Sequence, residues 1–562
     1  MKRILSIAAL SALIVGLIAV PASATDFEPL PHLVKNIMPG ATSSQIGTGS
    51  SGRLGSRLLF SSDTVGKGRE LWTTDGTAAG TKLVKDINPG IGESVPDHFV
   101  GFKGKLFFVA SDSDHGNELW TTDGTAAGTK RVSDIRPGFL GSDPEDLTVA
   151  GTNLFFTADT DGSGRELWMT NGTSTTLVKD INQTVLGSGT TEIVALGSKI
   201  LFNAEATAAE GNELWTSDGT AVGTKLLNNI YGGSGNASSP SKLTRSGSKV
   251  FFTAADSTHG RELWVTDGDP FHTAMASDIN LGLPSSDPDQ LFAYDGRLIF
   301  RATRPGEGVE PWISDGTALG TTSLGNLDTG NSGNDGSGAH DFTLFKGAVY
   351  FQAGDVAHGS EMWVTRGNQG STHLFKDTFP GSGHGEPGDF RAVGPLLVFS
   401  TYMSDAIGSE LWASDGTVAG TKLRKNIYPG NMNSSFPNML GTIGNTELFV
   451  ADEPTHGQEL WAYTTRSSTT KGYPKSHYSK STDKHHKIYL TVKVRATSTT
   501  PSGKVVLKSG SHIIGSAALH SGNAKIRITK KLGKGTHHIR AYYYGSVYVQ
   551  TSKSSYITIK VK

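Results

Sequence analysis

The sequence predicts an all-β protein, a β-propeller of about nine four-stranded blades followed by a small β-sandwich. Three observations support this prediction. The nine tryptophans recur every 47 to 51 residues, and a period near 50 is typical of propellers and other repeat arrays. Glycine is abundant, at 71 of 562 residues, and only 18% of residues are charged, as suits short strands joined by tight turns. No long 3.6-residue hydrophobic period follows the N-terminus, so helices should be few.

One clear copy of the period shows all four strands of a blade. An upstream strand is expected at residues 98–102, an apolar strand at 105–110, an alternating strand at 118–121 and a last strand at 131–135. Asp123-Gly124 predicts a hairpin turn, because glycine supplies the positive φ that such turns need. We expect the tryptophans to anchor each blade against its neighbour rather than to bind a ligand. They are Trp72, Trp120, Trp168, Trp215, Trp264, Trp312, Trp363, Trp412 and Trp461.

The two ends of the array predict ring closure. The ninth copy contains Trp461 but lacks the final strand, and the missing pattern stands at the other end, in residues 32–40. We therefore expect residues 32–37 to form the outer strand of the last blade and to remove the open edges of the array. This arrangement predicts a nine-bladed ring over residues 32–465. An open or split array is the alternative.

The repeated phrase resembles a known signature. Glu-Leu-Trp-x-x-Asp-Gly-Thr occurs intact at residues 70–77, 118–125, 213–220 and 410–417, and it looks like the signature of bacterial ELWxxDGT-repeat proteins. The periodic region covers roughly three quarters of the chain. The resemblance implies an exported propeller and supplies no catalytic residues. The departures are Asn171 and Arg366 at the Asp position, Pro311 and Met362 at the Leu position, and Asp269-Pro270 after the fifth motif.

The N-terminus reads as an export signal. Lys2 and Arg3 precede an uncharged, mostly apolar stretch that ends in a small-residue A-x-A site at Ala24, so residues 1–24 are predicted to be a signal peptide. The alternative is an uncleaved membrane anchor. The chain has no cysteine, hence no disulfide and no N-terminal Cys to carry a lipid. These features favour a bacterial protein that is secreted or held at the cell surface.

The charge is divided between two segments. Residues 466–562 hold 19 of the 51 Lys and Arg but one acid, Asp483, which leaves 32 bases and 51 acids in residues 1–465. The segments carry +18 and −19, and this asymmetry marks a domain boundary near residue 466. Residues 466–483 are rich in Ser, Thr and Lys and are predicted to be a linker.

Residues 484–562 are predicted to form a small sandwich. About 80 residues with turn signals every 8–12 residues suit that fold. The order of segments 501–506, 514–517, 522–524 and 541–545 resembles bacterial Ig-like repeat domains. The chain has Ser546 where that family usually has Asp.

A glutamate precedes Leu-Trp in every copy of the repeat. One interpretation is a ring of carboxylates that binds cations or sugar hydroxyls, and the other is a structural hydrogen bond to a turn or neighbouring blade. Nine equal copies favour the structural role, because an active site is normally a single asymmetric constellation. These residues are Glu70, Glu118, Glu166, Glu213, Glu262, Glu310, Glu361, Glu410 and Glu459.

Metal sites receive weaker support from the sequence. The Asp-Gly-Thr turns invite a calcium interpretation, but each offers one Asp, whereas Ca²⁺ takes six to eight oxygens, so a turn capped by its own side chain is favoured. Asp159 and Asp161 come closest to an ion loop. Four histidines precede the motif on different copies, where a shared zinc site is not expected. We predict no cofactor, metal or catalytic residue. The side chains concerned are Asp75, Asp123, Asp218, Asp267, Asp315, Asp415, His115, His259, His358 and His456.

The basic segment predicts binding to an anionic polymer, such as teichoic acid, lipopolysaccharide, acidic polysaccharide or, less favoured, nucleic acid. The alternatives are a soluble sandwich with a charged face, or docking on the acidic propeller of its own or another copy. Tyr542, Tyr543, Tyr544 and Tyr548 accompany the cations. The candidate binding residues are Lys504, Lys508, Lys525, Arg527, Lys530, Lys531, Lys534 and Arg540.

Three functional hypotheses follow from these features. The first is a non-enzymatic binding or adhesion protein, in which the propeller presents a ligand face and the basic domain associates with a surface polymer. The second is a propeller enzyme acting on extracellular glycans, which would need acids or a histidine from non-repeated loops, such as residues 326–341 (with His340) and 384–389, to converge at the channel. The third is a structural matrix component.

Overall fold

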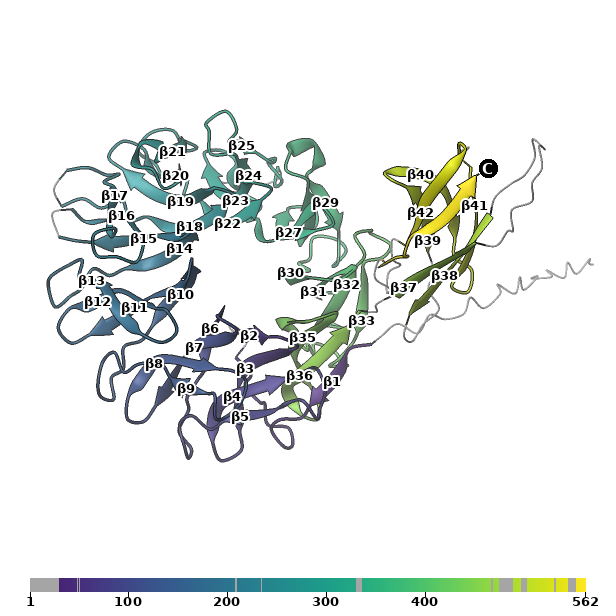
Figure 1. Cartoon of the computed structure of the whole chain (residues 1–562). Coiled ribbons are helices and arrows are strands. Elements are labelled where there is room, and N and C mark those ends of the chain that lie inside the picture. Colours follow the sequence, from purple (N-terminus) through teal and green to yellow (C-terminus); the bar gives the residue numbers. More distant parts are fainter. Residues whose placement is uncertain are drawn as a thin grey trace, which may run out of the picture.

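The computed structural model describes most of the chain and is all-β apart from two short 3-10 helices, η1 (Pro270–His272) and η2 (Gln369–Ser371). Nine four-stranded antiparallel sheets form a ring (Figure 1), and a β-sandwich follows. The region enclosed by the inner strands is called the channel below. The fold class predicted from the sequence is thereby confirmed. The described residues are 30–47, 49, 51–207, 210–233, 235–329, 336–465, 468–474, 489–496, 503–529, 532–543 and 552–561.

The first four blades have their strands in sequence order, from the channel to the rim. Blade 1 consists of β2 (Ser51–Leu54), β3 (Arg57–Thr64), β4 (Gly68–Thr74) and β5 (Lys82–Lys85). Blade 2 consists of β6 (Asp97–Phe102), β7 (Lys105–Asp112), β8 (Gly116–Thr122) and β9 (Lys130–Arg131). Blade 3 consists of β10 (Glu145–Ala150), β11 (Asn153–Thr160), β12 (Gly164–Thr170) and β13 (Thr175–Lys179). Blade 4 consists of β14 (Thr191–Leu196), β15 (Lys199–Glu205), β16 (Asn212–Ser217) and β17 (Lys225–Asn228).

The next four blades repeat this order. Blade 5 consists of β18 (Ser241–Ser246), β19 (Lys249–Asp256), β20 (Gly260–Thr266) and β21 (Ala274–Ser277). Blade 6 consists of β22 (Asp289–Tyr294), β23 (Arg297–Arg304), β24 (Gly308–Ser314) and β25 (Thr322–Ser323). Blade 7 consists of β26 (His340–Phe345), β27 (Ala348–Asp355), β28 (Gly359–Thr365) and β29 (His373–Lys376). Blade 8 consists of β30 (Gly388–Val393), β31 (Leu396–Tyr402), β32 (Ser409–Ser414) and β33 (Lys422–Lys425).

The ninth blade is built from both ends of the ring. It contains β34 (Asn438–Ile443), β35 (Thr446–Glu453), β36 (Gly457–Thr464) and, as its outer strand, β1 (His32–Lys35). Strand β1 runs antiparallel to β36, with Leu33 opposite Trp461. The inner strand β34 packs beside β2 of blade 1. The ring is therefore closed by the N-terminal strand, as the sequence predicts, and is neither open nor split.

The hydrophobic core of the ring is divided among the blade junctions. Leu59 and Leu71 of blade 1, for example, pack with Phe108 and Trp120 of blade 2. At the seam, Val34 packs with side chains of blades 1 and 9. Each of the nine junctions has one such cluster. A sheet buries its two faces against its neighbours, so each blade depends on both of them for stability.

Two local features differ from the sequence prediction. The last strand of blade 2 ends at Arg131 instead of residue 135, because the chain turns inward after Val132 and delivers the amides of the next residues to Glu118. The Asp-Gly turn is also longer than a two-residue hairpin. It continues to Gly128, where a Cβ atom would lie 2.0 Å from the carboxylate of Asp123. A side chain at position 128 would therefore displace the Asp123 carboxylate from its bonds with Thr125.

The sandwich has two sheets around its own apolar core. One sheet contains β37 (Ser468–Pro474), β38 (Tyr489–Ala496) and β41 (Asn523–Arg527). The other contains β39 (Lys504–Ser509), β40 (His512–Ala518), β42 (Gly535–Tyr543), β43 (Ser552–Lys553) and β44 (Ile557–Val561). Strand β37 lies within residues 466–483, which the sequence predicts to be a linker. Its backbone instead pairs with β38, since backbone pairing does not depend on the polar side chains that suggested a linker. The predicted signal peptide lies outside the described residues.

Candidate functional site

The repeated glutamates lie inside the blade junctions. Glu118 on β8 has no exposed surface, and its carboxylate accepts hydrogen bonds from the amides of Ile135 and Arg136, both at 3.2 Å, and from Oγ of Ser142 at 2.7 Å. These donors lie on the loop that leads to blade 3, and the carbonyl of Ser142 accepts the amide of Asp159 in that blade. Each glutamate thus holds the connection to the next blade.

The same arrangement recurs in all nine copies, each with a fully buried carboxylate. In blade 9, Glu459 accepts the amides of Ile37 at 2.9 Å and Met38 at 3.2 Å, so it fastens the residues that follow the closing strand. Burial raises the pKa of most of these carboxyls, although the donated hydrogen bonds oppose the rise. The groups with a raised pKa are Glu70, Glu118, Glu166, Glu262, Glu310, Glu361, Glu410 and Glu459. Because they are buried, these carboxylates are not positioned to bind ions or sugars from solvent.

Ring stability should depend on pH through the seam carboxyl. Burial raises the pKa of Glu459 from 4.5 to about 7. The folded ring therefore holds this proton more tightly than the unfolded chain does. The stabilising contribution of Glu459 is complete below about pH 4.5 and is lost as the pH rises through about 7. At about 1.4 kcal/mol per pH unit, the free energy of unfolding should fall by about 3 kcal/mol across this window.

Urea unfolding of wild type, Glu459→Gln and Glu93→Gln at several pH values measures this effect. Glutamine at position 459 cannot ionise, so that variant should show a shallower pH dependence of the free energy of unfolding. Glu93 is exposed, and its variant should keep the wild-type slope. Equal slopes in all three proteins would contradict the assignment.

The tryptophans also lie between blades. Eight are 5–9% exposed, and Trp168 is half-buried. A lysine on the outer strand of the preceding blade lies over the indole ring, as Lys85 does at 5.7 Å from the ring centre of Trp120. The pair recurs at Trp72, Trp215 and Trp461. These rings therefore face a neighbouring blade instead of an open surface.

The acids and histidines considered as metal ligands form local pairs. Asp123 accepts the amide and hydroxyl of Thr125 at 2.9 and 2.7 Å, and these bonds lower its pKa. Asp159 pairs with Arg165, and Asp161 pairs with Arg136, both at 2.6 Å. No three His, Asp or Glu side chains among the described residues are arranged to hold a metal ion.

Each of the four motif histidines contacts an acid three residues earlier, in its own hairpin. Nδ1 of His115, for example, lies 2.7 Å from Oδ1 of Asp112. The hydrogen bonds that His259 and His358 donate to Asp256 and Asp355 raise the pKa of these histidines. The pairs are His115–Asp112, His259–Asp256, His358–Asp355 and His456–Glu453.

The channel contains a belt of polar residues that the sequence analysis did not identify. Seven blades start their inner strand with a bulged, left-handed residue, at φ of 54 to 60°, which is an uncommon backbone conformation for these residue types. Several link neighbouring blades; the amide of Glu192, for example, donates to Asp146 at 3.0 Å. Each stands 22 or 23 residues before its tryptophan, which is the only sequence signal of the belt. The residues are His98, Asp146, Glu192, Lys242, Gln290, Asp341 and Asp389.

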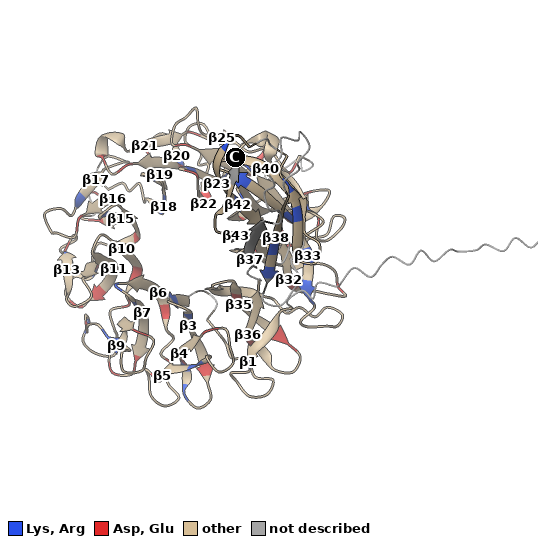
Figure 2. Ribbon diagram, turned by 45° about the vertical axis from the view of Figure 1, so that its right-hand side comes forward, with Lys and Arg blue, Asp and Glu red and all other residues tan. Residues whose placement is uncertain are grey.

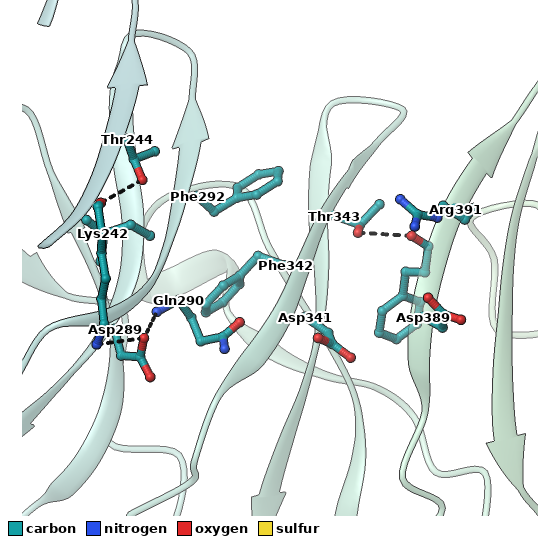
Figure 3. Close-up of a pocket in the computed structure, with 12 residues that line it drawn as sticks. Lys242, Thr244, Asp289, Gln290, Phe292, Asp341, Phe342, Thr343, Asp389 and Arg391 are labelled. Atoms are coloured by element: carbon teal, nitrogen blue, oxygen red, sulfur yellow. Dashed lines mark hydrogen bonds and ion pairs between the residues drawn. The ribbon is translucent and has the colours of Figure 1, made fainter. Parts of the chain in front are cut away.

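Two pockets lie along the channel. One, of about 450 Å³, is lined by β18, β22, β26 and β30 (Figure 3). The other, of about 980 Å³, is lined mainly by β2, β6, β10, β14 and β34. Asp341 and Asp389, from the two non-repeated loops singled out in the sequence, line the smaller pocket. The histidines of those loops are engaged with backbone groups, His340 with the carbonyl of Gly338 and His384 with the amide of Ser360.

The carboxyls of the pockets have different environments. Burial raises the pKa of Asp389 and of Asp146. Burial alone would raise the pKa of Asp289 as well, but its bonds with Lys242 and Arg301 outweigh this effect and hold that pKa at about 2. The pKa values of these channel carboxyls are therefore shifted in opposite directions.

The candidate polymer-binding cations lie on both outer faces of the sandwich. Lys504 and Lys508 are on β39, Lys525 and Arg527 on β41, and Arg540 on β42. Lys508 stands directly opposite Arg540. Lys534 is exposed just before β42, and Lys530 and Lys531 lie outside the described residues.

Three tyrosine rings contact these cations. One of the tyrosines that the sequence analysis grouped with the cations faces the core instead. Arg540 stacks 4.1 Å from the ring centre of Tyr556, Lys508 lies 5.0 Å from that of Tyr542, and Lys525 lies 4.9 Å from that of Tyr489. Tyr543 faces the core, where it is 1% exposed, because successive residues of a strand point to opposite faces. Tyr544 and Tyr548 lie outside the described residues.

Family comparison identifies the C-terminal domain. Residues 477–562 match the model of the bacterial Ig-like domain (group 3). A search of curated proteins by sequence finds no match. No helix among the described residues has the length and apolar character needed to cross a membrane.

Solved structures similar to this chain include the β-propeller domain of the Trilobed protease from Pyrococcus furiosus. It is 11% identical, with a TM-score of 0.33 over 68% of this chain and 98% of that chain. A prolyl endopeptidase is 12% identical (TM-score 0.36, 66% and 55% covered), and a puromycin hydrolase is 13% identical (0.36, 75% and 60%). This chain spans less than two thirds of the length of those two enzymes. The ring of nine four-stranded sheets is a β-propeller, and the domain that follows it matches the bacterial Ig-like domain.

Proposed function

We propose that this protein is an exported, non-enzymatic binding protein. The ring presents a ligand face, and the Ig-like domain associates with an anionic polysaccharide at a cell surface. The observation that carries the proposal is the charge of the Ig-like domain. Its described residues from 489 onward contain ten Lys and Arg and no Asp or Glu, and Figure 2 shows this contrast with the ring.

The arrangement of the cations supports an external anion as their partner. Lys508 and Arg540 are direct cross-strand neighbours, and like charges in that position destabilise a sheet. No described residue of the domain supplies a carboxylate to offset this repulsion. A polyanion lying across β39 and β42 would neutralise both side chains, while Tyr542 and Tyr556 hold them by cation–π contacts.

The glycan-processing alternative receives less support. Asp341 and Asp389 do converge at the channel. His340 and His384, however, are bound to backbone groups rather than to these acids, so the loops do not assemble an acid–base pair of the kind that the hypothesis required.

Retention of the full chain on immobilised polygalacturonate tests the proposal, with neutral dextran as the control polymer. We expect binding at low ionic strength that is lost at high salt, because exposed charges are screened. The double variant Lys508→Gln/Arg540→Gln should bind about tenfold more weakly, since each exposed ion contact contributes up to about 1 kcal/mol.

A matched variant removes two positive charges from the ring. Lys130 and Lys225 are exposed on β9 and β17, so their replacement by glutamine should leave retention at the wild-type level. Failure of the wild-type chain to bind polygalacturonate at low salt would overturn the proposal, as would equal losses in the two double variants.

A further inference from the structure

The smaller channel pocket contains five charged side chains, of which three are already engaged. Nζ of Lys242 lies 3.0 Å from Oδ1 of Asp289, and Arg301 donates to the other oxygen of that carboxylate at 2.8 Å. Asp389 accepts the amide of Met439 at 2.6 Å. These contacts tie neighbouring strands together and account for Lys242, Asp289 and Asp389.

Asp341 and Arg391 are the other two charged residues that line this pocket. Both side chains are exposed, and neither forms an ion pair within 4.0 Å with a described residue. They stand on the adjacent inner strands β26 and β30 and are separated from each other in the pocket (Figure 3). The pocket therefore offers one carboxylate and one guanidinium that do not neutralise each other.

Arg391 is a departure from the repeat. In seven blades, the residue two positions after the left-handed residue lies on the same inner strand, and in six of them it is uncharged. The fold therefore does not require a cation at this position. The seven residues are Val100, Thr148, Val194, Thr244, Phe292, Thr343 and Arg391.

A second departure lies behind Arg391. Glu447 on β35 is fully buried at a position where the other eight blades have Leu, Ile or Val. Its Oε2 accepts the hydroxyl of Thr442 at 2.7 Å, and its Oε1 has no hydrogen-bond partner among the described residues. The charges of Arg391 and Glu447 act on each other. The corner between blades 8 and 9 is therefore a non-repeated group of charges inside a repeated ring.

We propose that this pocket binds a small zwitterion, such as an amino acid or short peptide, with its carboxylate on Arg391 and its ammonium group on Asp341. A guanidinium recognises a carboxylate through two parallel hydrogen bonds. Phe292, which is half-buried and lines the same pocket, adds an apolar surface next to these polar groups. The volume of about 450 Å³ lies in the range of small-molecule sites.

A ligand with a single charge would satisfy this pocket less well. An anion would be repelled by the acids that line this pocket, Asp341 and Asp389 among them. A cation would leave Arg391 without a partner. The proposal concerns the ring and is independent of polymer binding by the Ig-like domain.

Calorimetric titration of the full chain with ω-amino acids of increasing length tests the proposal. The probes are glycine, γ-aminobutyrate and ε-aminocaproate, with hexanoate and hexylammonium as single-charge controls. We expect one zwitterion to bind at least tenfold more tightly than either control. The length of that zwitterion would then report the distance between the charged groups of Asp341 and Arg391. Equal affinity for the zwitterions and a single-charge control, or no binding by any zwitterion, would overturn the proposal.

Charge-neutral variants locate the site. Arg391→Gln and Asp341→Asn should each weaken the best zwitterion by about tenfold or more, since a charged hydrogen bond is worth about 1.5–3 kcal/mol. Two control variants remove one positive and one negative charge outside the pocket, Arg245→Gln on the inner strand β18 and Asp295→Asn in the turn after β22. Both should bind the zwitterion as the wild type does. Unchanged affinity in Arg391→Gln would refute the assignment, provided that thermal unfolding shows a folded ring. Retention on polygalacturonate, measured in parallel, should be unaffected by either pocket variant.

Discussion

Replacement of Val34 by aspartate should open the ring and lower the free energy of unfolding by about 4 kcal/mol or more. Val34 is 5% exposed and packs at the seam with Leu58, Phe60 and Trp72 of blade 1. A buried carboxylate there would lack any partner. The closing strand is only four residues long, so loss of its apolar anchor should release it and expose β36.

The matched control places the same residue on the same strand, at the exposed His32. His32→Asp should keep wild-type stability to within about 1 kcal/mol. Urea unfolding followed by tryptophan fluorescence measures both variants, and small-angle scattering reports whether the ring opens. A closed ring of wild-type stability in Val34→Asp would show that closure does not depend on this strand.

Glu118→Ala should lower the free energy of unfolding by about 3–5 kcal/mol. The substitution leaves the amides of Ile135 and Arg136 and the hydroxyl of Ser142 without their acceptor. A donor stranded in a buried site costs about 1–3 kcal/mol, and the loop to blade 3 loses its attachment. We expect the effect to spread to blade 3, because neighbouring blades share one core cluster.

Chemical unfolding of Glu118→Ala and of the exposed-site variant Glu93→Ala measures this effect, and hydrogen exchange locates it. Protection should decrease in blades 2 and 3 before it decreases in blades 5 to 7. A loss of less than about 1 kcal/mol in Glu118→Ala would mean that the carboxylate does not hold the junction.

The predictable parts of the structure are those that one copy of the repeat contains. The apolar strand before each motif, the alternating strand through Trp120 and the Asp123-Gly124 turn are local patterns. The displaced strand at residues 32–37 was predictable because the last copy lacks it. By contrast, the shortened strand β9 was not predicted, since its end is set by the attachment of the following loop to Glu118.

The outward face of the Ig-like domain was predictable only in part. Clustered Lys and Arg indicated an anion-binding segment, but strand register decides which tyrosines accompany them. Tyr542 and Tyr543 are neighbours in the sequence and point to opposite faces of β42. A shift of one residue in register would have exchanged their roles.

The amino-acid pattern alone establishes the number of blades, the identity of the closing strand and the charge difference between the two domains, because spacing and composition are properties of the linear chain. The channel arises only when nine copies close into a ring. Asp341 and Arg391 are 50 positions apart, yet the packing of blade 7 on blade 8 places them in one pocket. Glu447 comes from blade 9, and its charge interacts with that of Arg391. The residues that depart from the repeated pattern therefore come together through packing between blades. A single copy of the repeat does not contain this packing.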